Sequence, residues 1–362
     1  MAPNKKLASL RREIDTLDLR LLELINRRAE FAIEVSGLKR KDCLGVYDPS
    51  REREIEGRIT EKNSGPLSDE DILFVFREII SRCRSLQHDD RKIAYLGPEG
   101  SFSNQAAFRE FGVSSEFFPM PSFEDVFEEV YAKRADFGIL PVENSVEGSV
   151  GDVLDMLLEW DLSISAECFE RIELSLLSLG TDISQVKTVA SHPQALGQCR
   201  KWIATNLYGV ALVETPSTAA AAKMSARDPS VAAIASRFAG SIYDLRTIQS
   251  HIEDSPRNTT RFLVVGRNNP PPSGQDKTSI AFSVRDEPGA LHKAFFLPFS
   301  ESSINLTKIE SRPSRDGQWE YVFFADFSGH REDRSVRETL ERVGDNCVFL
   351  KVLGSYPAGA PV

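Results

Sequence analysis

A regular spacing of apolar residues at the N-terminal end most constrains what this chain can fold into. The spacing is kept for about four heptads, which predicts one long helix that packs lengthwise against other helices. Arg28 occupies a position in this stripe where a leucine is expected. A charge on a buried face is costly unless it is neutralised, so Arg28 has a buried partner, extends to the surface, or binds an anion. The stripe consists of Leu7, Leu10, Ile14, Leu17, Leu21, Leu24, Phe31, Val35 and Leu38.

Two further cations bear on the role of Arg28. Lys39 follows it by 11 residues, which returns to nearly the same face of a helix with about 3.6 residues per turn. Arg11 precedes Arg28 by 17 residues. That separation is about 25 Å along the axis, too far for both side chains to hold one small anion. If Arg11 contributes to this site, it must come from a second copy of the chain, so a dimer is implied.

Two shorter helices are expected after the long one. Asp48 is a natural N-cap and Pro49 suits the first helical position. Arg51 and Glu52 follow in the first turn, where they could equally be solvated charges. The third helix is expected from residue 68 to about residue 87. Its apolar face holds Ile72, Phe76, Ile79, Ile80 and Cys83, and Gln87 follows at the end of that face.

These residues, in this order, resemble the all-helical, AroQ-type chorismate mutase domain over about residues 5 to 88. The resemblance implies an intertwined dimer that converts chorismate to prephenate. It places Arg11 of one chain and Arg28 of the other on the two substrate carboxylates. Such a rearrangement needs pre-organised cations but no acid, base or nucleophile. The matching positions are Arg11, Arg28, Lys39, Asp48, Arg51, Glu52 and Gln87, with Cys83 where the family usually has serine.

The resemblance also assigns roles within that site. Lys39 and Gln87 would hydrogen-bond the ether oxygen, where negative charge develops as the C–O bond breaks. Glu52 and Asp48 would orient the substrate hydroxyl.

After residue 91 the pattern changes to short apolar strands that alternate with helices, which indicates an α/β domain. Its glycines do not spell a dinucleotide-binding or P-loop motif. Serine and threonine at the strand-to-helix junctions are first of all caps, although several such helix ends could also bind an anion. The expected strands are 92–96, 137–141, 163–167, 186–191, 210–214, 231–235 and 262–265, and the expected helices are 122–132, 151–160, 194–207 and 218–225.

Five ordered segments of this region resemble the motifs of prephenate dehydratase. They are residues 97–103, 143–150, 191–199, 217–222 and 258–262, the last being Asn-Thr-Thr-Arg-Phe. The resemblance implies two α/β lobes, each like half of a periplasmic solute-binding protein, with prephenate between them. Aromatisation drives the loss of the ring hydroxyl and CO₂, so no cofactor and no metal are expected.

Within that site, Thr260 is expected to donate to the leaving hydroxyl. A free threonine is a very weak acid, so His192 is the alternative donor, although a histidine before a proline at a helix start also suits a local hydrogen bond. Arg261 is expected to be structural. The residues expected to line the cleft are Ser101, Asn144, Ser145, Glu147 and Gln194.

A proline-rich segment, residues 268–277, is predicted to be a semi-stiff linker. The βαββαβ order expected beyond it is the ferredoxin-like arrangement. Two motifs there, Gly289-Ala290-Leu291-His292 and Glu310-Ser311-Arg312-Pro313, resemble the ligand-binding motifs of the ACT domain attached to these dehydratases. The resemblance implies feedback inhibition by L-phenylalanine bound between paired ACT modules.

Composition excludes several other classes of protein. The net charge of −10 argues against a nucleic-acid surface. The five cysteines include no Cys-x-x-Cys pair, so neither a disulfide framework nor a zinc site is predicted. No apolar run is long enough to span a bilayer, and the N-terminal residues lack an apolar signal core. We therefore expect a cytoplasmic protein with no membrane partner.

Together these patterns predict a multidomain, bifunctional enzyme of phenylalanine biosynthesis. We expect an all-α mutase domain at residues 1–90, a two-lobed α/β dehydratase domain at 91–267, the linker at 268–277 and an ACT regulatory domain at 278–357. Chorismate and prephenate are the expected substrates, L-phenylalanine the effector, and a homodimer or higher homo-oligomer the assembly. The alternatives are a non-catalytic amino-acid sensor, which would leave Arg28 and the Asn-Thr-Thr-Arg-Phe segment unexplained, and an enzyme with only one live activity.

Overall fold

The computed structural model describes residues 3–41, 49–86, 91–112, 115–313 and 321–359. The chain divides into two compact units, which we describe separately. One consists mainly of the N-terminal helices, and the other contains the remaining sheets and helices. Within the described residues, no helix has both the length and the apolar character needed to cross a membrane.

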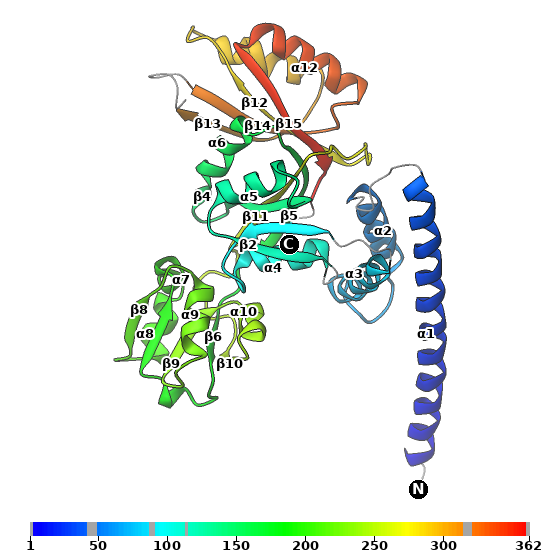
Figure 1. Ribbon diagram of the computed structural model, residues 1–362, viewed down its shortest axis with the longest axis vertical. Helices are drawn as coiled ribbons and strands as arrows, with labels where there is room; N and C mark the ends of the chain where they lie inside the picture. The colour runs from blue at the N-terminus through cyan, green and yellow to red at the C-terminus, as the bar shows by residue number, and fades with distance from the viewer. Residues whose placement is uncertain (1–2, 42–48, 87–90, 113–114, 314–320, 360–362) are drawn as a thin grey trace. The chain divides into compact units, whose positions relative to one another are not determined.

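The N-terminal helices are α1 (Pro3–Lys41), α2 (Pro49–Lys62) and α3 (Asp69–Ser85), as the sequence predicts. Helix α1 is a single long helix (Figure 1), and its apolar stripe is exposed in this chain: Leu17 is 55% and Leu24 61% exposed. The Ser68 hydroxyl accepts the Asp71 N–H at 3.1 Å, which caps α3. An apolar stripe of this length calls for a packing partner.

The first α/β lobe is built on a sheet with the strand order β2-β1-β3-β11-β5, to which β4 is added beside β3. Strands β1 and β3 are parallel, whereas β11 runs antiparallel to both β3 and β5. The carboxyl ends of β3 and β5 and the amino end of β11 therefore meet at one edge of the sheet. The elements are β1 (Lys92–Leu96), α4 (Phe102–Phe111), β2 (Glu116–Met120), α5 (Phe123–Tyr131), β3 (Phe137–Asn144), β4 (Gly148–Ser149), α6 (Gly151–Glu159), β5 (Ser163–Arg171) and β11 (Thr259–Gly266).

The second lobe has a five-stranded sheet of order β10-β6-β9-β7-β8. The chain enters this lobe after β5 and leaves it before β11, and the two crossing segments are bonded to each other. The Ile172 N–H donates to the Asn258 carbonyl at 2.8 Å, and the Ile252 N–H to the Leu174 carbonyl at 3.0 Å. The elements are β6 (Ser175–Ser178), η1 (Ile183–Gln185), β7 (Thr188–Ser191), α7 (Pro193–Gln198), α8 (Arg200–Asn206), β8 (Ala211–Glu214), α9 (Thr218–Ser225), β9 (Val231–Ala235), α10 (Arg237–Ile242) and β10 (Arg246–Gln249).

The C-terminal module has the expected strand and helix order and an antiparallel sheet, β13-β14-β12-β15. Helix α12 lies along one face of this sheet (Figure 1), where Val336 and Val343 pack with Ile280 and Phe282. The first helical segment of the module, expected at residues 288–300, begins at His292 with a π-helical turn. The elements are β12 (Asp276–Ser283), η2 (His292–Phe296), α11 (Leu297–Glu301), β13 (Leu306–Pro313), β14 (Tyr321–Ser328), α12 (Arg334–Asn346) and β15 (Phe349–Pro357).

The opposite face of the C-terminal sheet shares a hydrophobic core with the first lobe. Ala281, Phe324 and Leu353 pack in one cluster with Leu263 and Val265 of β11. Both modules accordingly belong to one compact unit, and β12 already begins at the end of the segment expected to be a linker. The predicted multidomain fold class is confirmed, but the module is docked on the first lobe rather than only tethered to it.

Gly354 provides a test of this docking, because its backbone lies against β5. A Cβ added at Gly354 would lie 2.3 Å from the Ile164 carbonyl oxygen and 2.8 Å from the Ile164 nitrogen. We expect Gly354→Ala to lower the free energy of unfolding by about 1–3 kcal/mol, measured by urea denaturation, because the backbone itself must move.

Gly344→Ala in α12 is the matched control, since its added Cβ would meet only the Leu350 Cδ2 atom at 3.6 Å. It should be neutral or stabilising by up to about 1 kcal/mol, because alanine favours the helix. Equal stability of the two variants would contradict the docking inferred from Gly354.

Candidate functional site

Three polar side chains form a row across neighbouring strands of the first-lobe sheet, at the end where β3 and β5 finish and β11 begins. Thr260 of β11 lies opposite Asn144 of β3 on one side and Glu170 of β5 on the other. Residues directly opposite in antiparallel strands project from the same face, so the three side chains share one face. Thr260 is only 8% exposed.

The amide of Asn144 fixes the hydroxyl of Thr260. Its Nδ2 donates to Thr260 Oγ1 at 2.9 Å and to Asn258 Oδ1 at 2.8 Å. Its Oδ1 accepts the N–H groups of Val146 at 3.0 Å and Glu147 at 3.2 Å, which determines the orientation of the amide. Thr260 Oγ1 is thus an acceptor, and in the described part of the chain no group accepts the Thr260 proton. The hydroxyl can therefore donate this proton to a bound ligand.

Glu170 was not predicted as a site residue. Its carboxylate accepts from Gln105 Nε2 at 2.6 Å and lies 3.4 Å from Arg109 Nη1. Burial raises the pKa of Glu170, and the contacts with Arg109 and Gln105 only partly oppose that effect. The row therefore ends in a carboxyl group that binds a proton more readily than an exposed one. No local sequence pattern marked it, because it lies inside a strand.

The side-chain hydroxyls of the two serines expected to bind substrate form hydrogen bonds with backbone groups of the protein. Ser145 Oγ donates to the Arg257 carbonyl at 3.1 Å and accepts the Thr259 N–H at 3.0 Å. Ser101 Oγ donates to the Leu96 carbonyl at 3.1 Å and accepts the Asn104 N–H at 3.2 Å at the start of α4. Both hydroxyls shape the loops of the site. Glu147 is exposed in the turn between β3 and β4.

The second lobe contributes helix N-termini and a hydrogen bond to Asn258. His192 caps α7: its Nδ1 accepts the N–H of Gln194 at 3.4 Å, a local role that favours Thr260 as the donor. Gln198 Oε1 accepts from Asn258 Nδ2 at 3.1 Å, and Asn258 in turn accepts from Asn144. Gln198 was missed as a site residue although it lies in the Ser191–Cys199 motif.

Only some of the residues expected at the mutase site have side chains that the structure describes. Arg11 is exposed and Arg28 half-buried, both on α1, while Cys83 is buried in α3. Arg51 forms an ion pair with Glu54 in the first turn of α2. Lys39 and Glu52 belong to α1 and α2 but their side chains lie outside the described part, and Asp48 and Gln87 lie outside the described residues.

The two ACT motifs occupy different environments. Gly289 has a φ of +78°, a conformation that favours glycine, and Ala290 and Leu291 follow it half-buried. On β13 the side chains alternate: Ser311 and Pro313 are exposed, whereas Glu310 and Arg312 face the first lobe. Glu310 bonds to Ser149, and Arg312 lies 3.3 Å from Asp155 of α6.

Across the described residues, no cluster of three or more histidine, cysteine or acidic side chains could hold a metal ion.

Comparison with known proteins gives three family matches in chain order. Residues 10–88 match chorismate mutase type II, residues 93–270 match prephenate dehydratase, and residues 278–345 match the ACT domain.

The relatives include proteins of the same length and organisation. A bifunctional chorismate mutase/prephenate dehydratase of Aquifex aeolicus is 45% identical over 98% of both chains. The crystal structure of a prephenate dehydratase from Arthrobacter aurescens in complex with L-Phe is 32% identical, with a TM-score of 0.68 over 74% of this chain and 90% of that one. A solved structure described as GqqA, a novel type of quorum-quenching acylase, is 30% identical with the same TM-score over 74% of this chain and 98% of that one. The chain belongs to the family of bifunctional chorismate mutase/prephenate dehydratases.

Proposed function

We propose that this protein rearranges chorismate to prephenate with its N-terminal helices and converts prephenate to phenylpyruvate at the edge of the first α/β lobe. The observation that carries the second step is the hydrogen bond from Asn144 Nδ2 to Thr260 Oγ1. It holds the hydroxyl oxygen as an acceptor and leaves the proton for a substrate.

In the dehydratase step, the C–CO₂ bond of prephenate breaks and its electron pair enters the ring as the ring hydroxyl departs. The hydroxyl must be protonated, or strongly hydrogen-bonded, as the C–O bond lengthens. Thr260 donates that hydrogen bond, and the proton that leaves with the water comes ultimately from solvent. Asn144, Ser145, Glu147, Ser101 and Gln194 complete the substrate site, the two serines through the loops they hold.

Replacement of Thr260 tests this role. We expect Thr260→Ala to lower dehydratase kcat by at least about 100-fold, because the departing hydroxyl loses its donor. Mutase turnover should stay within about twofold, since the pericyclic site shares no residue with β11. Phenylpyruvate formation and chorismate loss are measured separately.

Thr260→Ser should retain most of the activity, and Thr259→Ala, the adjacent threonine, is the matched control. Loss of turnover only in His192→Ala would reassign the donor. A wild-type chain inactive in both assays would be the non-catalytic sensor, and activity in one assay alone would identify an enzyme with a single live site.

For the mutase, we propose a homodimer, or a higher homo-oligomer built from it, in which a second copy of α1 covers the exposed apolar stripe. Leu10, Ile14 and Leu21 are 48–55% exposed in the single chain. Arg11 of one chain and Arg28 of the other hold the substrate carboxylates, Lys39 and Gln87 bind the ether oxygen, and Asp48, Arg51, Glu52 and Cys83 complete the site. The cytoplasmic location stays a prediction from sequence.

Complementation between two inactive variants tests the shared site. Arg11→Ala and Arg28→Ala should each abolish mutase turnover in a homodimer. Co-expressed at equal levels they should recover about a quarter of the wild-type rate, because half of the dimers are mixed and each has one intact site of two.

Arg11→Ala co-expressed with Arg11→Gln is the control for nonspecific recovery, because every dimer in that mixture lacks Arg11 at both sites. Activity from the Arg11→Ala and Arg28→Ala mixture that never exceeds that of either variant alone would show that the two arginines do not meet across a dimer.

For the ACT module, we propose that L-phenylalanine inhibits the dehydratase by binding beside Gly289–Leu291 and Glu310–Pro313. Inhibition at a distance requires two states that differ in affinity for the effector. Support comes from the L-Phe complex of the Arthrobacter relative and from the exposure of Ser311 and Pro313 on an edge strand.

Ser311→Tyr would fill that site with a side chain of the ligand's size. We expect the L-phenylalanine concentration for half-inhibition to rise by at least about tenfold with little change in uninhibited turnover, because the strand tolerates tyrosine. Thr307→Tyr, on the same exposed face but outside the motif, is the control. Unchanged inhibition in Ser311→Tyr would remove this segment from the effector site.

A further inference from the structure

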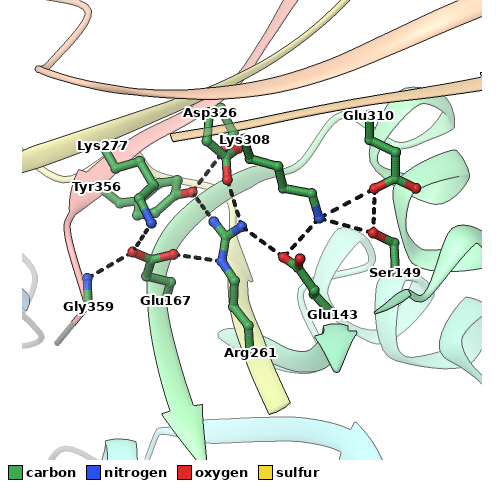
Figure 2. Close-up of polar contacts among 11 residues, drawn as sticks. Glu143, Ser149, Glu167, Arg261, Lys277, Lys308, Glu310, Asp326, Tyr356 and Gly359 are labelled. Carbon is green, nitrogen blue, oxygen red and sulfur yellow. Dashed lines mark hydrogen bonds and ion pairs between the residues drawn. The ribbon is translucent and has the colours of Figure 1, made fainter. Parts of the chain in front are cut away.

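Arg261, the residue after Thr260, is buried on the opposite face of β11. It is 7% exposed, and its guanidinium has three short contacts, shown in Figure 2. Nε donates to Glu167 Oε2 at 2.7 Å, within the first lobe. Nη1 donates to Asp326 Oδ2 at 2.6 Å and Nη2 to the Tyr356 hydroxyl at 2.9 Å, both in the C-terminal module. The module therefore supplies two of the three partners.

These partners are themselves fixed. Glu167 is fully buried and also accepts from Lys277 Nζ at 2.6 Å and the Gly359 N–H at 2.9 Å. Ser279 Oγ lies 2.6 Å from both Asp326 Oδ1 and the Tyr356 hydroxyl. A planar guanidinium in such a cluster cannot shift without leaving a buried charge unpaired. The position of Arg261 is consequently tied to that of the C-terminal sheet.

A second contact from the C-terminal module reaches β3, the strand that carries Asn144. Lys308 of β13 donates to Glu143 Oε2 at 2.9 Å and to Ser149 Oγ at 3.1 Å (Figure 2). Glu143 is the residue before Asn144, whose amide holds the Thr260 hydroxyl. Lys308 is also 3.4 Å from Glu310 of the ACT motif. The strand that carries the motif thus lies against the segment that carries Asn144.

We propose that Arg261 is a positioning residue for Thr260, and that the C-terminal module, through Asp326, Tyr356 and Lys308, transmits effector binding to the dehydratase site. The inference rests on the proposed dehydratase function and names how its regulation reaches the reacting group. An effector that shifts β13 and β14 displaces Asp326 and Lys308, and the backbone of β11 and β3 follows. Thr260 and Asn144 then leave the geometry in which the hydroxyl can donate.

The first test is Arg261→Lys. Lysine keeps the positive charge but lacks the two terminal guanidinium nitrogens that contact Asp326 and Tyr356 at the same time. We expect dehydratase kcat to fall by at least about tenfold with KM changed by less than about threefold, because the reacting hydroxyl is displaced while the substrate contacts remain. Arg267→Lys, at the other end of β11, is the matched control. Arg267 donates to the Val130 and Ala135 carbonyls, so its replacement should leave kcat unchanged.

The second test is Tyr356→Phe, which deletes one hydroxyl and serves if Arg261→Lys does not fold. We expect L-phenylalanine to bind with its wild-type Kd, measured by calorimetry, while its maximal inhibition of the dehydratase is reduced. Such a separation of binding from inhibition would not follow from a purely structural role.

Three outcomes would overturn the proposal. One is a dehydratase kcat within about twofold of wild type in Arg261→Lys. Another is a folded Arg261→Lys protein in which mutase turnover falls in parallel with dehydratase turnover. The third is unchanged inhibition in Tyr356→Phe. Failure of the proposed function is distinct, since the wild-type chain would then form no phenylpyruvate from prephenate at all.

Discussion

The buried ion cluster around Arg261 is the interaction on which the rest of this unit depends. Side chains alternate along a strand, so β11 presents Thr260 to one face of its sheet and Arg261 to the other. The first face carries the row of Asn144, Thr260 and Glu170, where we propose that the dehydratase step occurs, and the second is covered by the C-terminal sheet through Asp326 and Tyr356. Removing one partner of such a buried pair typically costs about 3–5 kcal/mol. One strand therefore carries both the proposed donor and the side chain that holds the C-terminal module.

This docking changes the interpretation of the proline-rich segment, residues 268–277. A linker of that composition favours a semi-stiff tether, but the chain around it is anchored. Ser273 Oγ donates to Asp276 Oδ1 at 2.6 Å, and His330 Nε2 lies 3.3 Å from the Pro270 carbonyl oxygen. The shared core with β11 then fixes the module on the first lobe. Regulation can act through a packed interface rather than through the random encounters of a tethered domain.

Periodicity and motif order were sufficient to predict the three N-terminal helices, the strand–helix alternation and the family, although the helix expected at 194–207 is two helices, α7 and α8. They could not predict partners distant in the chain. The motif around Glu310 suggested a ligand site, yet its charged side chains meet Ser149 and Asp155, more than 150 positions away. Asn144 was expected to line the cleft, and only the structure shows that its amide also holds Thr260. Glu170 could not be predicted as a site residue, because only the pairing of β5 with β11 brings it beside Thr260.

The alternation on β13 explains how one short strand can serve both the effector and the enzyme. Lys308, Glu310 and Arg312 face the first lobe, and the residues between them are exposed. A ligand on the exposed side can move the strand without competing for the contacts on the other. Coupling of this kind is reciprocal in binding free energy. Any part of the inhibition that weakens prephenate binding through β13 makes prephenate weaken L-phenylalanine binding by the same factor, whereas displacement of the Thr260 hydroxyl lowers kcat without that reciprocity.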